Sequence, residues 1–344
     1  SGLSASIIAV GPAYNDGRQG GFWNDQPLAY FIKPDGVTYR SWSTFMGGGL
    51  DLIEGTFDQP TRAGAGNYSW SWNGITGHGH AWVMRPYEIS GDTLLGFIHI
   101  ETERAGSDSR LMAYGLGVTF DLGKSWSYLG DIHNKNSTSN TGGGPVLLVD
   151  GYLYAYFNDG GPAVARAHRD SVFAAAKQRK MVPWFKYYNG QWNSPSVTGQ
   201  SSRLFTISGS PTSGDLHSHA THIRSIGTYL LTVNNQGTNA RCLFLMSKDG
   251  VNWTNQYTVA TGGNIHPYHT FVGTKASGAR NDQSEQGNNF RCYWTQKTWS
   301  YNDDVFKRVD IAVTPRVIAS SNSVSAASME RLRRRYQSFP SQSS

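Results

Sequence analysis

Long apolar runs, cysteines and charges are all scarce in this 344-residue sequence. No stretch approaches the ~18 apolar residues that a membrane helix needs, so no membrane span is predicted. Charged residues make up only 16% of the sequence. Together with a high content of aromatic residues and glycine, this argues against helical bundles and disordered chains. The two cysteines, Cys242 and Cys292, each lie in an apolar run. The two cysteines can therefore form one disulfide or remain as two buried free thiols, and the sequence does not decide between these states.

Aromatic residues (13%) and glycine (40 residues) are abundant instead. This mix is typical of short strands joined by tight turns, and closed all-β folds often reach this length as one domain. The net charge of +6 only weakly favours polyanionic partners, because part of the excess lies in four arginines near the C-terminus. They are Arg331, Arg333, Arg334 and Arg335.

A histidine-containing pattern occurs three times, at residues 77–86, 217–223 and 265–272. Each time, histidines stand at the entrance to a short apolar run, and a second run rich in aromatic and β-branched residues follows. Blade-sized units that recur in this way indicate a β-propeller, whose innermost strands all start at one central funnel. We therefore expect these histidines to converge at that funnel.

Turn signals divide residues 1–317 into about five such units. We predict an all-β, five-bladed β-propeller with a strand at residues 6–10 that completes the last blade. One helical insertion is expected at residues 171–179, with Asp170 as its N-cap. Residues 55–77 have the composition of a surface loop. His133 and His168 lie in polar contexts and are predicted to be at the surface. Residues 318–344 are predicted to form a Ser-rich linker and a short basic C-terminal helix or tail.

Residues 119–126 match the Asp-box pattern Ser/Thr-x-Asp-x-Gly-x-Ser/Thr-Trp, and residues 247–253 match a shortened version. In such a turn Asp121 accepts backbone N–H bonds, Gly123 supplies a positive φ, and Trp126 packs between sheets. The chain resembles five-bladed propeller carbohydrate-active enzymes, namely the arabinanase and invertase-like glycoside hydrolases, over nearly its whole length. The likeness to propeller ulvan-type polysaccharide lyases is looser and rests on the spacing of His80 and His99.

The resemblance implies three funnel carboxylates, of which the sequence supplies one. Residues 22–27 are similar to the Trp-x-Asn-Asp-Pro opening of the invertase-like group, which makes Asp25 the expected base or nucleophile. His80 stands where a second acid would be expected, and the glycines at 142–144 stand where a third would be. A funnel histidine starts near pKa 6.5 and can protonate a leaving oxygen, and Glu101 is a further candidate acid. The predicted catalytic residues are Asp25, His80, His219, Glu101 and His269.

Aromatic and polar side chains around the funnel are candidates for substrate binding. Tryptophan faces stack on sugar rings, although packing between blades uses most propeller aromatics. The candidates are Trp23, Trp70, Trp72, His78, Arg85, His222 and Tyr268. His217 and His219 share one face of a strand and could hold a structural divalent metal, although no cofactor is required.

The sequence thus predicts a monomeric, secreted or cell-surface enzyme that cleaves glycosidic bonds of a polysaccharide or oligosaccharide, with no nucleic-acid partner. Hydrolysis by Asp25 with a funnel histidine is preferred. A lyase is the alternative, with histidine, tyrosine and arginine removing a proton from a uronate polymer. A propeller that binds glycans without catalysis is the third possibility, because fold alone does not establish an activity.

Overall fold

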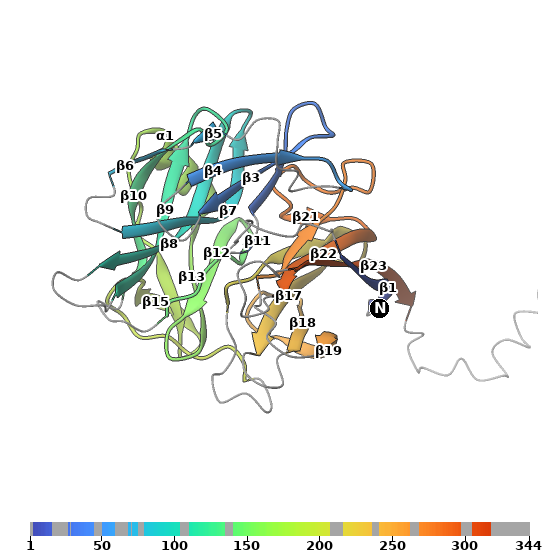
Figure 1. The fold of residues 1–344 in the computed structure, drawn as a ribbon. Helices are drawn as coiled ribbons and strands as arrows, with labels where there is room; N and C mark the ends of the chain where they lie inside the picture. The colour runs from blue at the N-terminus through green and yellow to red at the C-terminus, as the bar shows by residue number, and fades with distance from the viewer. Residues whose placement is uncertain are drawn as a thin grey trace, which may run out of the picture.

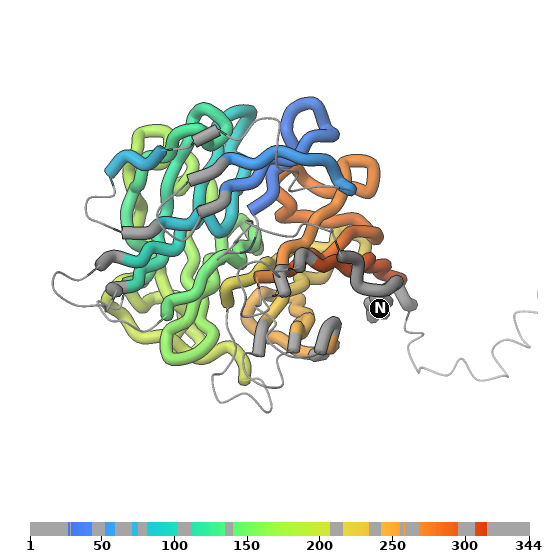
Figure 2. Tube along the Cα trace, in the orientation of Figure 1, coloured from blue at the N-terminus to red at the C-terminus, as the bar shows by residue number. Residues whose placement is uncertain are grey.

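The computed structural model describes residues 3–15, 27, 29–44, 50–58, 68–69, 71–74, 79–103, 110–134, 140–206, 216–235, 241–261, 268–296 and 305–317. Their strands form five sheets arranged around one axis (Figure 1). From residue 29 to residue 272 the chain passes from one sheet to the next in sequence order (Figure 2). The predicted five-bladed β-propeller is confirmed.

The first two blades come from the N-terminal third of the chain. Blade 1 consists of β2 (Ala29–Ile32), β3 (Tyr39–Thr44), β4 (Leu50–Gly55) and β5 (Tyr68–Ser69). Blade 2 consists of β7 (Gly79–Ser90), β8 (Thr93–Glu103), β9 (Arg110–Thr119) and β10 (Ser125–Asn134), with β6 (Ser71–Asn73) added in parallel to β10. The prediction of a loop over residues 55–77 is therefore wrong for β5 and β6. Three-residue and shorter strands carry too few residues to show a period.

The third and fourth blades each contain five strands. Blade 3 consists of β11 (Val146–Val149), β12 (Tyr152–Asn158), β13 (Pro162–His168), β14 (Phe185–Tyr188) and β15 (Gln191–Pro195). Blade 4 consists of β16 (Ala220–Ile223), β17 (Thr228–Asn235), β18 (Arg241–Ser247) and β19 (Thr254–Thr261), with the 3-10 turn η1 (Arg224–Ile226) between its first two strands. The two-residue strand β21 (Glu285–Gln286) pairs in parallel with β16 on its inner side.

The fifth blade joins the two ends of the described chain. It consists of β20 (Thr270–Val272), β22 (Asn289–Gln296), β23 (Val305–Val317) and β1 (Leu3–Asn15). β1 is antiparallel to β23, with an unbroken register from the Leu3–Val317 pair to the Val10–Asp310 pair. The predicted closure of the last blade by an N-terminal strand is confirmed. It ties the ring shut with backbone hydrogen bonds, which leaves no open gap between first and last blade.

Each of the five interfaces between neighbouring blades has its own apolar cluster. Blades 1 and 2 share Trp42 and Trp126, whose ring centroids lie 5.6 Å apart. Blades 5 and 1 share Tyr30 and Tyr293, at 6.4 Å. The remaining clusters join blades 2 and 3, blades 3 and 4, and blades 4 and 5. Burial of large side chains between twisted sheets is thus continuous around the ring, and it is the main term that stabilises the fold.

The predicted helical insertion is present as α1 (Arg169–Lys177), the one α-helix in the described part of the chain. It begins two residues earlier than predicted, and its N-cap position is His168, which makes no side-chain cap bond. Asp170 lies in the first turn and pairs with Arg169 at 2.8 Å, so its prediction as N-cap is wrong. A carboxylate in the first turn still favours the helix through the macrodipole.

His133 is buried, not at the surface as predicted. Its side chain is only 1% exposed, and its ring stacks on Phe157 of blade 3 with centroids 4.4 Å apart. His168, at the end of β13, is exposed as predicted. Cys242 and Cys292 are buried free thiols from blades 4 and 5. Burial, and then the hydrogen bond with Cys292, raises the pKa of the Cys242 thiol. No helix among the described residues is long and apolar enough to cross a membrane.

The turn at residues 119–126 is held by the carboxylate of Asp121. One oxygen accepts hydrogen bonds from the Thr119 hydroxyl at 2.7 Å and the Ser125 N–H at 3.0 Å, and the other accepts from the Ser125 hydroxyl at 2.6 Å. Burial alone would raise the pKa of Asp121, but the bonds from Ser125 and Thr119 outweigh it and hold the pKa below its ordinary value. The ionised carboxylate therefore stabilises the turn.

Replacing Asp121 with alanine is expected to lower the free energy of unfolding by about 2 kcal/mol, because hydrogen bonds to a charged group are lost. The folded pKa lies below the unfolded one, so this contribution is present above about pH 4 and disappears as the pH falls through the folded pKa. Urea titrations of the wild type and of Asp121→Ala measure both effects. Asp92→Ala, in an exposed turn of the same blade, is the control. An equal loss in both variants, or a loss that does not shrink as the pH falls below about 4, would contradict this role.

Candidate functional site

The inner strands of all five blades begin at the same end of the axis, called here the entrance end; the opposite end is the far end. First strands of neighbouring blades contact one another, as β2 does with β7 and β11 with β16. The segments that lead into β11, β16 and β20 are residues 140–145, 216–219 and 268–269. They come together at the entrance end, where Gly142, His217 and Tyr268 each lie next to His99 or to one another.

Four side chains from three blades gather at the entrance end. His99, on β8, lies with its ring centroid 5.0 Å from that of His217, which precedes β16. The ring of His217 lies 5.9 Å from that of Tyr268, which precedes β20. Glu101 follows His99 by two residues on the same face of β8, and its carboxylate lies 3.4 Å from His99 Nε2. The site thus combines two imidazoles, a phenol and a carboxylate.

The hydrogen bonds of His99 determine where its protons lie. Nδ1 is 3.0 Å from the Gly142 carbonyl oxygen, which can only accept, so Nδ1 carries a hydrogen. In the neutral ring Nε2 is then an acceptor facing Glu101. Burial lowers the pKa of His99, and the nearby His217 lowers it further, although Glu101 opposes both. The neutral imidazole is therefore favoured, and one proton is needed between Nε2 and the carboxylate oxygen of Glu101.

The glycine-rich segment before β11 allows the close approach of blades 2 and 4. Gly143 packs so tightly on the ring of Tyr114 that any side chain at this position would overlap it. Tyr114 is the cross-strand neighbour of His99, and its hydroxyl accepts the Gly144 N–H at 3.3 Å. The glycines at 142–144, which stand where the family resemblance implies an acid, instead supply backbone groups that position His99 and Tyr114.

Below the entrance, Arg85 and His219 lie deep in the molecule. Arg85 is 1% exposed, and a bulge in β7 places it in register with Phe97. His219 is 2% exposed, and its Nδ1 accepts the Phe271 N–H at 2.9 Å. Burial lowers the pKa of His219 well below its usual value, and the charge of Arg85 adds to this effect. His219 is neutral and carries its hydrogen on Nε2.

Residues 280–284 cover the far end of the axis. Their backbone and side chains bond to blade 1 through the Ile32 N–H at 2.8 Å, to blade 2 through the Glu88 N–H at 2.9 Å, and to blade 4 through the His222 N–H at 2.9 Å. Asp282 at the centre of this segment is fully buried. Among the described residues, this segment therefore links three blades at the far end.

The predicted site residues fall into four groups. Asp25, Trp23, Trp70 and His78 lie outside the described residues. Of His80 the structure describes only the backbone, which is in register with Glu101 on β8. The described side chains at the entrance end are Glu101 and the predicted ligands His217 and Tyr268.

The other described candidates lie away from the entrance. Trp72 is on β6 at the outer edge of blade 2, where it packs on Trp126 at 6.2 Å. His222 is at the end of β16, beside β21, and lies against Tyr229. His269 is fully buried and stacks on Trp294 at 5.7 Å. Arg85 and His219 lie on the axis but beneath the entrance, as described above.

Two features of the site were not selected from the sequence. His99 supported only the loose likeness to ulvan-type lyases and was not among the predicted site residues, because it lies inside an apolar strand; its alternation with Glu101 is the signal that could have found it. The segment 280–284 is polar and has no period, so nothing in the sequence indicated that it covers the axis.

The predicted metal pair does not fit a divalent cation. Nδ1 of His219 already accepts a backbone N–H, its Nε2 carries a hydrogen, and the positive charge of Arg85 lies close by. In the described ranges no three His, Cys, Asp or Glu side chains gather as metal ligands. His217 alone is too small a ligand set for a structural metal site.

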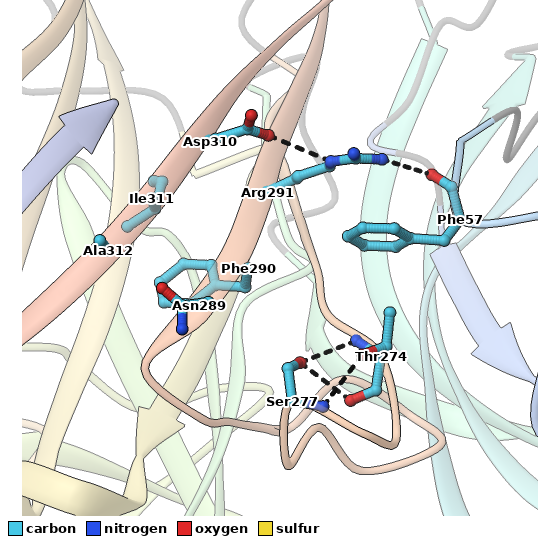
Figure 3. A pocket seen from close by; sticks show the side chains of 9 residues that line it. All are labelled: Phe57, Thr274, Ser277, Asn289, Phe290, Arg291, Asp310, Ile311 and Ala312. Carbon is cyan, nitrogen blue, oxygen red and sulfur yellow. Dashed lines mark hydrogen bonds and ion pairs between the residues drawn. The ribbon is translucent and has the colours of Figure 1, made fainter. Parts of the chain in front are cut away.

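A pocket of about 420 Å³ lies at the far end between blades 5 and 1 (Figure 3). The guanidinium of Arg291 covers the ring of Phe57 at 3.9 Å and bonds to the Phe57 carbonyl oxygen and to Asp310. None of the predicted site residues lines this pocket. The Arg291 charge is paired within the blade interface, so the pocket belongs to the packing of the ring and not to the entrance site.

The fold is similar to that of a family 117 glycoside hydrolase from the marine bacterium Zobellia galactanivorans, with 12% identity, 90% of each chain covered and a TM-score of 0.51. An endo-arabinanase of family 43 from Bacillus licheniformis matches at 13% identity over 87% of this chain and 98% of its own, with a TM-score of 0.47. A native arabinanase of Bacillus subtilis matches at 11% identity over 85% and 94%, with a TM-score of 0.46. No family model and no curated protein matches the sequence. These three structural neighbours are five-bladed propeller glycoside hydrolases, and at these identities the likeness is one of fold.

Proposed function

We propose that this chain is a glycoside hydrolase that cleaves glycosidic bonds of a polysaccharide at the entrance end of the propeller. The observation that carries the proposal is the pair formed by Glu101 and His99. The Glu101 side chain is 18% exposed and so reaches solvent, while the His99 side chain beside it is 4% exposed and is held by the Gly142 carbonyl oxygen. A carboxyl group placed against a neutral imidazole acceptor is suited to keep and deliver a proton.

In this mechanism Glu101 is the general acid. Cleavage needs protonation of the leaving oxygen and attack on the anomeric carbon. The neutral ring of His99 accepts at Nε2 and orients the carboxyl group, and His217 and Tyr268 border the same space as hydrogen-bonding groups for sugar hydroxyls. Asp25 has the second role, as base or nucleophile, on the strength of its Trp-x-Asn-Asp-like surroundings.

Changing Asp25 to asparagine is expected to reduce kcat by about 10²- to 10⁴-fold, because an amide can neither activate water nor attack the anomeric carbon. The melting temperature should stay within a degree or so of the wild type. Asp150→Asn, at an exposed turn, provides a matched control that should retain full turnover. Unchanged kcat in Asp25→Asn would remove this residue from the mechanism.

Elimination is a second candidate function, and one contact favours it. The ring of His217 lies between His99 and Tyr268, and an imidazole beside a phenol is the kind of base and acid pair that a polysaccharide lyase uses. A lyase also needs a cation for the uronate carboxylate. Arg85 is the one arginine among the predicted substrate-binding residues, and it is buried below the entrance.

The test is product analysis with purified protein on a panel of neutral and acidic polysaccharides. New reducing ends without ultraviolet absorbance of an unsaturated sugar support hydrolysis. New reducing ends with that absorbance mark a lyase and overturn the proposal. Binding without any product on the whole panel favours the glycan-binding propeller and overturns both catalytic functions.

A further inference from the structure

Arg85 is a buried cation whose hydrogen-bond donors have no acceptor. Nε, Nη1 and Nη2 are all shielded from solvent and bond to nothing in the described part of the chain. Burial lowers the pKa of Arg85, to about 10, so the guanidinium is charged at neutral pH. A buried charge whose donors have no acceptor is strongly unfavourable, and native proteins pair such groups.

Asp282 is the acidic residue with the strongest electrostatic effect on Arg85, but it does not supply the missing acceptor. Asp282 raises the pKa of Arg85, which shows that the two charges influence each other. Its carboxylate, however, is taken up by the N–H and hydroxyl of Ser284, at 2.9 and 2.6 Å, and by the Glu88 N–H and Arg280. Asp282 is committed to the segment that closes the far end.

Two further groups near Arg85 also have a hydrogen to donate. Nδ1 of His219 accepts the Phe271 N–H, so Nε2 carries a hydrogen, and this buried nitrogen has no partner among the described residues. Tyr114, whose pKa is also sensitive to Arg85, uses its hydroxyl oxygen as acceptor for the Gly144 N–H. Its hydroxyl hydrogen therefore remains to be donated. The unmet groups around Arg85 are donors from blades 2 and 4.

We propose that a small anion, chloride under ordinary ionic conditions, is bound on the propeller axis between Arg85 and His219. A halide accepts several hydrogen bonds and donates none, which matches a set made of donors alone. A water molecule would accept about two of these bonds and would bring two further hydrogens that need acceptors. The anion neutralises the guanidinium and links blade 2 to blade 4 above the segment 280–284.

The inference is independent of the enzymatic activity, and its direct test is diffraction from crystals of the full chain grown in sodium bromide. An anomalous bromide peak within hydrogen-bond distance of Arg85 and His219 Nε2 is expected. Electron density for water alone at that place, or a peak confined to the surface, would overturn the proposal. This measurement needs no variant.

A second test follows the melting temperature in solution at constant ionic strength. Replacing gluconate by chloride should raise Tm by about 2 to 5 °C and then saturate, as expected for a ligand that binds only the folded state. Arg85→Met should lose this dependence. Arg40→Met should keep it, because Arg40 is a buried arginine whose nitrogens are all bonded, to Glu54 and to the Leu122 carbonyl oxygen. The same chloride response in Arg85→Met and the wild type would contradict the site.

Discussion

Replacing Glu101 with glutamine is expected to lower kcat by about 10²- to 10⁴-fold, the range that a general acid contributes. The amide keeps the shape of the side chain and can still donate a hydrogen bond to Nε2 of His99. It cannot give up a proton to a leaving oxygen. Folding should be nearly unaffected, because the substitution is isosteric and the side chain is partly exposed.

The measurement is kcat and KM on whichever substrate the panel identifies, together with Tm. Glu88→Gln is a matched control: Glu88 is on β7, in the same blade, and accepts from Asn281 Nδ2 at the far end. It should retain wild-type kcat. If Glu101→Gln keeps its kcat, or loses only substrate affinity, Glu101 binds substrate and is not the acid.

Replacing Gly123 with alanine is expected to destabilise the fold by more than about 3 kcal/mol. Gly123 has φ +78°, and a methyl group there would overlap the indole ring of Trp42. That ring is fully buried and donates from Nε1 to the Gly123 carbonyl oxygen at 2.8 Å. Strain in the turn and overlap in the core therefore add up at the interface between blades 1 and 2.

Gly91→Ala separates the two effects. Gly91 also has a positive φ, +52°, but its missing side chain faces open space. Gly91→Ala should lower the free energy of unfolding by about 1 kcal/mol, which is the strain of a left-handed conformation alone. Guanidinium titrations of both variants measure the difference. Similar losses would mean that the Trp42 contact does not hold blades 1 and 2 together.

The recurrent units of the sequence predicted the fold well, for a physical reason. A blade is a local structure in which each strand pairs with the next along the chain, so turn residues and alternation indicate it directly. Even the pairing with the longest sequence separation, β1 with β23, could be anticipated, because an apolar strand without a nearby partner must find one. The short strands β5, β6 and β21 could not, since their pairing is decided by neighbours in space.

The site was predictable only in part. Repeated histidines before apolar runs indicated which segments meet at the axis, and His217 and Tyr268 do meet there. The pairing of His99 with Glu101 depends on a carbonyl oxygen from another blade, at Gly142, which no local pattern reveals. The burial of Arg85 and His133 likewise results from contacts with distant strands, so their sequence contexts indicated exposed or ligand-binding positions.

The most direct test of a hydrolase at the entrance end is digestion of the cleaved polysaccharide in water enriched in oxygen-18, followed by mass spectrometry. Hydrolysis places one solvent oxygen at each new reducing end, so the wild type should give labelled, saturated products and Glu101→Gln almost none. Unlabelled, unsaturated products from the wild type, or equal labelling by Glu101→Gln, would contradict the account.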